Sequence, residues 1–218
     1  MKKIKYLLLA VFLILGIMNC GKKTENPEKE QVASGQTQGD TQKFLSDKEI
    51  EEIIKISDEN PDKINSYISI INGLNEAVLG AYSGAYKKDF TDGSDGFKVP
   101  QGEAIDNFLK IYEQYEDKYK ELDVILDEAE KKTGQKPELK KLDGFAKGFI
   151  ENMKKERIQM EEMYKYYKSK EYEKDSFSKG KELNDAYFKA IYASGEKYIP
   201  FYSSFQEIFA VVENTPKK

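Results

Sequence analysis

Three tyrosines at helical spacing are the residues of this 218-residue sequence best suited to recognise a ligand. Tyr112, Tyr115 and Tyr119 stand three and four positions apart, so they share one face of a helix. Several converging phenol rings could line a pocket for a sugar, a glycan or an apolar ligand. Tyrosines at this spacing also fill helical cores, and we favour that interpretation. The three residues are therefore a speculative ligand-binding set.

Acidic side chains are numerous enough to consider glycosidic hydrolysis, which two carboxylates across a cleft can perform. However, Glu116 stands four positions before Lys120, and Glu151 four before Lys155, the pattern of an ion-paired, solvated face. The sequence contains no histidine, which excludes Ser-His-Asp and Cys-His catalysis and His-ligated zinc. A serine–lysine pair, the remaining nucleophilic alternative, has no recognisable motif. We expect no catalytic residue, no metal site and no enzyme activity, with a cell-wall hydrolase as the least favoured alternative.

Cys20, the single cysteine, specifies a covalent modification. It ends a segment in which three lysines precede an apolar stretch of about 13 residues, too short to span a membrane as a helix and typical of a signal peptide. Ile17-Met18-Asn19-Cys20 resembles the bacterial lipobox, although Asn19 replaces the usual Gly, Ala or Ser. The resemblance implies cleavage before Cys20 and attachment of lipid, palmitate among the acyl chains, to the cysteine. This lipid is the expected covalent group, and we expect no other cofactor.

Composition excludes nucleic acid as a partner. Removal of residues 1–19 takes away three lysines and no acidic residue, so the formal charge changes from −4 to −7. Arg157 is the only arginine, and phosphate or base recognition depends on clustered arginine and lysine. The polar segment Gly21–Lys43 contains one sizeable apolar residue, Val32, and is predicted to be a disordered tether.

Helical periodicity accounts for the rest of the chain. Ser46 and Glu49 have capping-box spacing and predict the start of a short helix. Long helices are expected over about 61–88, 105–134, 137–167 and 177–212, and Pro200 should kink or split the last. Ile105 to Ala129 carries a heptad-like seam through the three tyrosines. The fold class is therefore all-α: an elongated antiparallel helical bundle of about four long helices plus a short N-terminal helix.

Two stretches carry a resemblance to a known family. They are Lys63-Ile64-Asn65-Ser66-Tyr67-Ile68 with Ile71-Asn72-Gly73-Leu74-Asn75, and Tyr166-Tyr167-Lys168-Ser169-Lys170-Glu171-Tyr172 with Asp175, Phe177 and Lys179-Gly180-Lys181-Glu182-Leu183. Both resemble the YiiG-like bacterial lipoproteins, a helical family of unknown function, over about residues 60–212. Members often have histidine where this chain has Asn184, so any role of that histidine is absent. The resemblance implies no catalytic residue.

Three segments follow: a lipoprotein signal peptide (1–19), a tether (20–43) and a helical bundle domain (44–218). We expect a lipid-anchored protein of the bacterial cell envelope, outside the cytoplasm, in the outer membrane if the host has one, since Gly21 rather than Asp follows Cys20. Its expected role is a non-enzymatic binding or interaction module, with the membrane and an envelope protein or small molecule as partners. The alternative is a small-ligand or glycan carrier with a tyrosine-lined interior.

Overall fold

Within its described residues, the protein is an elongated bundle of helices without a β-strand. The computed structural model describes residues 42–77, 79–93 and 95–214. The helices are α2 (Asp47–Glu59), α3 (Asp62–Glu76), α4 (Leu79–Phe90), α5 (Gly102–Lys132), α6 (Lys140–Lys168), α7 (Tyr172–Asp175) and α8 (Ser178–Asn214). The prediction of an all-α bundle with several long helices is confirmed.

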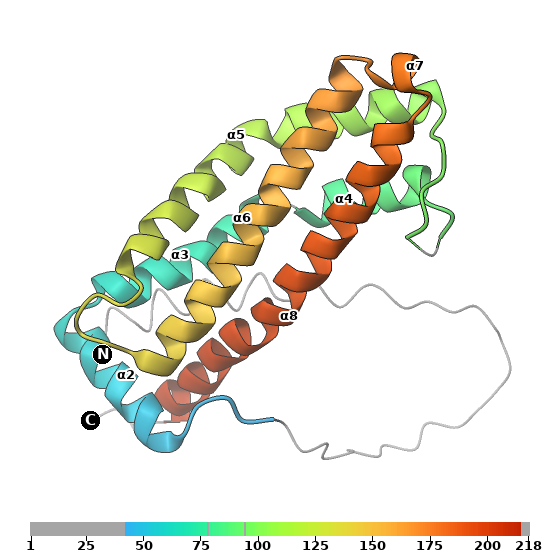
Figure 1. Cartoon of the computed structure of the whole chain (residues 1–218). Coiled ribbons are helices and arrows are strands. Elements are labelled where there is room, and N and C mark those ends of the chain that lie inside the picture. Colours follow the sequence, from blue (N-terminus) through green and yellow to red (C-terminus); the bar gives the residue numbers. More distant parts are fainter. Residues whose placement is uncertain (1–41, 78, 94, 215–218) are drawn as a thin grey trace, which may run out of the picture.

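Four columns of helix run side by side along the bundle (Figure 1). α3 and α4 follow one another along α5, α5 packs on α6, and α6 packs on α8. At 1.5 Å per residue, the 37 residues of α8 extend about 55 Å, which makes the bundle elongated. Short α2 lies across one end, and one-turn α7 lies at the other end.

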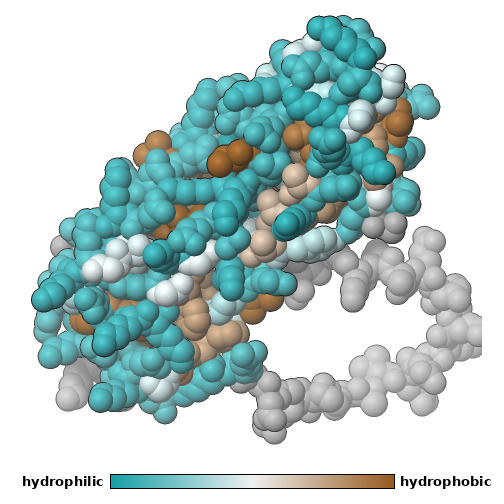
Figure 2. Space-filling view, viewed as in Figure 1, coloured by the Kyte–Doolittle hydropathy of each residue, from teal (hydrophilic) through white to brown (hydrophobic). Residues whose placement is uncertain are grey.

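The core follows the periodicity seen in the sequence. The buried positions of α5 are Ile105, Phe108, Tyr112, Tyr119, Leu122, Leu126 and Ala129. Tyr115 belongs to the same seam but is only half-buried. The surface in Figure 2 is largely hydrophilic, with apolar residues in scattered positions along the helices. The stripes of the helices therefore close on one another inside a single bundle.

The helix predicted over about 61–88 is two helices, because α3 ends at Glu76 and α4 begins at Leu79. Val78, predicted to belong to the buried stripe, lies outside the described residues. Residues of low helix propensity surround this interruption, with Asn75 before it and Gly80 and Gly84 after it. No proline marks the position, so the continuous apolar periodicity predicted one helix where the structure has two.

Pro200 does not split the last helix, since α8 continues through it to Asn214. Proline has no N–H to donate to the carbonyl group four residues before it, so one backbone hydrogen bond of the helix is lost. Its own carbonyl oxygen can still accept a hydrogen bond. The Pro200 carbonyl accepts a hydrogen bond from Ser204 Oγ at 2.7 Å. Packing of Phe201 and Phe205, both buried, holds the helix on the core on the C-terminal side of the proline.

Candidate functional site

A pocket opens at the end of the bundle that holds α2. This end, called the α2 end, contains α2, the connection between α5 and α6, and the last turns of α8 (Figure 1). The pocket has a volume of about 280 Å³. Its lining residues are Leu45, Glu49, Glu52, Ile53, Glu138, Leu139, Lys140, Lys141 and Leu142. We call it the α2–α6 pocket, because α2 forms one wall and the start of α6 the other.

The α2 wall is fixed by two sets of hydrogen bonds. Ser46 Oγ accepts from the Glu49 backbone N–H at 3.3 Å, and Glu49 Oε2 accepts from the Ser46 N–H at 2.7 Å. This is the predicted capping box, now confirmed. In addition, the backbone N–H groups of Phe44 and Leu45 each donate to the carboxylate of Glu207 on α8, both at 2.7 Å. The chain therefore begins α2 at a fixed place against α8.

The α6 wall is fixed by a buried ion pair. Lys63 Nζ on α3 lies 2.6 Å from Asp143 Oδ2 in the first turn of α6, and Lys63 is only 3 % exposed. The same ammonium donates to the carbonyl oxygens of Gln135 (2.7 Å) and Pro137 (3.0 Å) in the α5–α6 connection. Tyr67 Oη donates to Asp143 Oδ1 at 2.8 Å, and burial with this bond raises the pKa of the tyrosine. All polar atoms of the pair thus have hydrogen-bond partners, which connect α3, the α5–α6 connection and the start of α6 at this wall.

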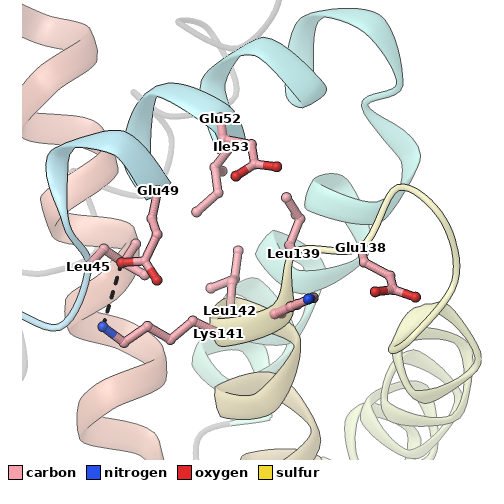
Figure 3. A pocket seen from close by; sticks show the side chains of 9 residues that line it. Leu45, Glu49, Glu52, Ile53, Glu138, Leu139, Lys141 and Leu142 are labelled. Atoms are coloured by element: carbon pink, nitrogen blue, oxygen red, sulfur yellow. Dashed lines mark ion pairs between the residues drawn. The ribbon is translucent and has the colours of Figure 1, made fainter.

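Aliphatic side chains form the floor of the α2–α6 pocket, and charged side chains form its rim. The floor residues Leu45, Ile53, Leu139 and Leu142 are all buried. Glu49 and Lys141 bridge the two walls at 3.6 Å, drawn as the dashed line in Figure 3. The hydrogen bond from the Ser46 N–H, helped by Lys141, lowers the pKa of Glu49, so this carboxylate is ionised at neutral pH.

The predicted tyrosine set is brought together, but in the packed interior. Tyr112 and Tyr119 ring centroids lie 5.2 Å apart, and those of Tyr115 and Tyr119 6.4 Å apart. Tyr112 stacks on Tyr164 at 4.1 Å, with the two rings 11° from parallel. None of these tyrosines lines the α2–α6 pocket or the second pocket, a hollow of about 200 Å³ between α3 and α5. A ligand role for Tyr112, Tyr115 and Tyr119 stays a prediction.

Sequence reasoning missed a polar cluster in the middle of the bundle. Glu156 and Arg157 interrupt the apolar stripe of α6, yet both are buried. The Arg157 guanidinium donates to both carboxylate oxygens of Asp123, at 3.0 and 3.2 Å, and lies 4.6 Å from the centre of the Tyr119 ring. Ser194 Oγ donates to Glu156, whose pKa is raised by burial. Two consecutive charged residues in the middle of an apolar stripe are the signal in the sequence that could have predicted this cluster.

Other sequence-based expectations meet the structure only in part. Cys20, the signal peptide and most of the tether lie outside the described residues. Across the described part of the chain, no helix is both long and apolar enough to cross a bilayer. In the same residues, no group of three or more acidic, cysteine or histidine side chains is arranged to hold a metal ion.

The fold and the pocket define a helical bundle with a small, part-polar cavity at one end. The chain belongs to a family described as a protein of unknown function, DUF3829, whose sequence pattern matches residues 58–217. This match agrees with the expected helical domain of unknown function; the YiiG-like relationship itself stays a prediction. No curated protein and no solved structure matches the chain. The α6 wall of the pocket lies inside the matched residues, and most of α2 precedes them.

Proposed function

We propose that the protein is a lipid-anchored, non-enzymatic binding module of the bacterial cell envelope. One observation carries the proposal: Ile17-Met18-Asn19-Cys20 follows a basic and apolar segment of signal-peptide length. The lipid on Cys20 would be its single covalent group. The helical domain would then face away from the cytoplasm, on the outer membrane in a host with two membranes.

The geometry of the helical domain supports a binding role rather than a catalytic one. Its most deeply buried charges are engaged in internal ion pairs, Lys63 with Asp143 and Arg157 with Asp123, which serve packing. The α2–α6 pocket, by contrast, presents charged side chains around an apolar floor. Such a combination of an apolar surface and a few polar groups is typical of ligand pockets.

The anchor is tested by metabolic labelling with radioactive palmitate and by membrane fractionation. Wild-type protein should be labelled and recovered in the membrane fraction, while Cys20→Ala should lose the label and its processing. Asn19→Ala is the matched control, because it moves the sequence toward the usual lipobox and should be processed like wild type. A Cys20→Ala variant that keeps wild-type processing and membrane association would contradict the proposal.

A small-ligand or glycan carrier is a second candidate, favoured by two buried hydroxyl groups. Tyr119 Oη and Tyr187 Oη are buried and have no hydrogen-bond partner among the described residues. A buried hydroxyl without a partner costs about 1–3 kcal/mol, and a ligand hydroxyl could supply the missing bond if the bundle opened, because neither tyrosine lines the α2–α6 pocket or the hollow between α3 and α5. Soluble peptidoglycan fragments should then raise the melting temperature of wild type but not of Tyr119→Phe. The absence of a shift in wild type would end this candidate.

A further inference from the structure

The α2–α6 pocket contains charged side chains that the fold does not use. Glu52 and Glu138 are exposed and form no ion pair in the described part of the chain, and Lys140 shares both properties. Glu49 and Lys141, by contrast, already neutralise each other across the pocket. Two carboxylates and one ammonium thus remain available to a ligand on the rim.

The two free carboxylates belong to opposite walls. Glu52 and Ile53 follow Glu49 by three and four positions, about one turn of α2, and all three line the cavity. Glu138 comes from the α5–α6 connection, just before α6 begins. In Figure 3, Leu139, one of the floor residues, lies between Glu52 on one side and Glu138 on the other. A cationic group above Leu139 would therefore lie between the two walls that carry these carboxylates.

The free ammonium lies at the start of α6. Lys140 is the first residue of the helix, and Leu139 before it supplies no side-chain cap, so the first turn keeps backbone donors. A carboxylate group placed beside Lys140 would gain from the ammonium and from the positive end of the helix. The pocket thus offers a place for a positive group and a place for a negative group on the same rim.

The floor sets the third requirement of a ligand. Leu45, Ile53, Leu139 and Leu142 present branched aliphatic side chains and no hydrogen-bonding group at their ends. A branched aliphatic group of similar size would bury apolar surface there, which is favourable because that surface is removed from water. A cavity of about 280 Å³ is slightly below the range of drug-sized ligand pockets, so the occupant must be small.

We propose that the α2–α6 pocket binds a free α-amino acid with a branched aliphatic side chain. The α-ammonium lies between Glu52 and Glu138, the α-carboxylate faces Lys140, and the side chain packs on the aliphatic floor. The site is preformed, because the Lys63–Asp143 pair fixes one wall and the Glu207 carboxylate fixes the other. The assignment rests on the proposed binding function and is independent of the lipid anchor.

The test is calorimetric titration of the full chain, purified in detergent, with L-leucine and three analogues. Leucinamide lacks the carboxylate, 4-methylpentanoate lacks the ammonium, and glycine lacks the side chain. We expect L-leucine to bind, and each analogue to bind at least tenfold more weakly. Equal binding of L-leucine and 4-methylpentanoate, or no binding of L-leucine at millimolar concentration, would overturn the proposal.

Variants localise the site. Glu52→Gln combined with Glu138→Gln should weaken L-leucine binding at least tenfold, since both partners of the ammonium are lost. Glu51→Gln is the matched control, because Glu51 is an exposed neighbour on α2 that does not line the pocket, and its binding should stay within twofold of wild type. All three substitutions are at exposed positions, and thermal melting verifies that each variant folds. Unchanged binding in the double variant would place leucine elsewhere and overturn the assignment.

The outcome for the pocket is separate from the outcome for the anchor. A chain that is labelled through Cys20 but ignores L-leucine would overturn this assignment and leave the anchored binding module standing. A chain that binds L-leucine through Glu52 and Glu138 but is not lipidated would contradict the lipid anchor and support the assignment of the pocket.

Discussion

Glu156 carries a titratable carboxyl group into the packed interface between α6 and α8. It is 7 % exposed, and Ser194 Oγ of α8 donates a hydrogen bond to it. Burial raises the pKa of this carboxyl group, while the Ser194 hydroxyl and the charge of Arg157 lower it by less. The folded protein therefore holds the proton to higher pH than the unfolded chain does.

This raised pKa predicts the sign of a pH dependence. Between the unfolded pKa, about 4.3, and the higher folded pKa, the folded state binds more protons, so stability falls as pH rises through that window. Glu156→Gln keeps the acceptor for Ser194 and removes the charge. We therefore expect the urea midpoint of Glu156→Gln, relative to wild type, to be higher at pH 7.5 than at pH 4.5.

The control for this prediction is Glu161→Gln, whose carboxylate is exposed on α6 and pairs with Lys165 at 2.5 Å. An exposed pair contributes about 0–1 kcal/mol, and its loss should not produce the same rise between the two pH values. A Glu156→Gln difference that stays constant with pH would show that the carboxyl group titrates normally.

At the scale of elements, α4 is a short helix that contains residues unfavourable to a helix. Its buried side chains are Tyr82, Tyr86 and Phe90. A Cβ atom at Gly80 or Gly84 would meet nothing within 4 Å, so close packing does not explain these glycines. At Gly73 in α3, by contrast, a Cβ would lie 3.0 Å from Ile125 Cδ1, so the end of the Ile125 side chain would have to shift to admit it.

Alanine at both open positions of α4 should therefore stabilise the protein. Each Gly→Ala change contributes up to about 1 kcal/mol of helix propensity, so Gly80→Ala with Gly84→Ala should raise the unfolding free energy by about 1–2 kcal/mol. Urea denaturation measures the gain, and amide hydrogen exchange should slow within α4. Gly134→Ala is the opposing control, because its φ of +73° disfavours alanine and should cost about 1 kcal/mol. A double variant less stable than wild type would show that the low helix propensity of Gly80 and Gly84 does not limit the stability of α4.

A second prediction at this scale concerns the connection between α5 and α6. Lys63→Met would leave the Asp143 carboxylate buried without its counter-ion, which should cost about 3–5 kcal/mol in urea denaturation. Adding Asp143→Asn removes the uncompensated charge and keeps an acceptor for Tyr67, so most of the loss should be recovered. Lys55→Met, at an exposed position of α2, should change stability by no more than about 0.5 kcal/mol. If the single and the double variant lost the same unfolding free energy, the loss would not come from the unpaired charge of Asp143.

The elements were predictable from the sequence to different degrees. Apolar spacing located α5 and its buried seam, and the Ser46–Glu49 capping box located the start of α2, because both signals are local. The Lys63–Asp143 pair joins residues 80 positions apart, and the walls of the pocket join α2 to α6. Neither the ion pair nor the pocket leaves a signal in the local sequence, since a lysine that will be buried cannot be distinguished there from one that will be exposed. The site was therefore found only from the folded arrangement.

At the scale of the whole molecule, the orientation of an anchored bundle relative to the membrane would follow from the end at which the predicted tether joins it. Phe44 and Leu45 are hydrogen-bonded to Glu207 at the α2 end, so the chain from Cys20 enters the domain there. A polar random coil of the length of segment 21–43 spans about 25–30 Å, which is shorter than the roughly 55 Å of α8. An anchored domain should therefore hold its α2 end nearer the membrane than its α7 end.

Energy transfer to a lipid-bound acceptor measures this orientation. Cys20 is the single native cysteine and its sulfur is predicted to carry lipid, so a maleimide dye can be directed to Glu51→Cys on α2 or to Lys174→Cys on α7. In vesicles containing an acceptor-labelled phospholipid, transfer from position 51 should exceed transfer from position 174. The difference should vanish when the acceptor is moved from the bilayer into bulk solution. Equal transfer in vesicles would mean that the bundle lies along the surface, and stronger transfer from position 174 would mean that the α7 end docks on the membrane. In the expected orientation, the α2–α6 pocket lies at the end of the bundle nearer the bilayer.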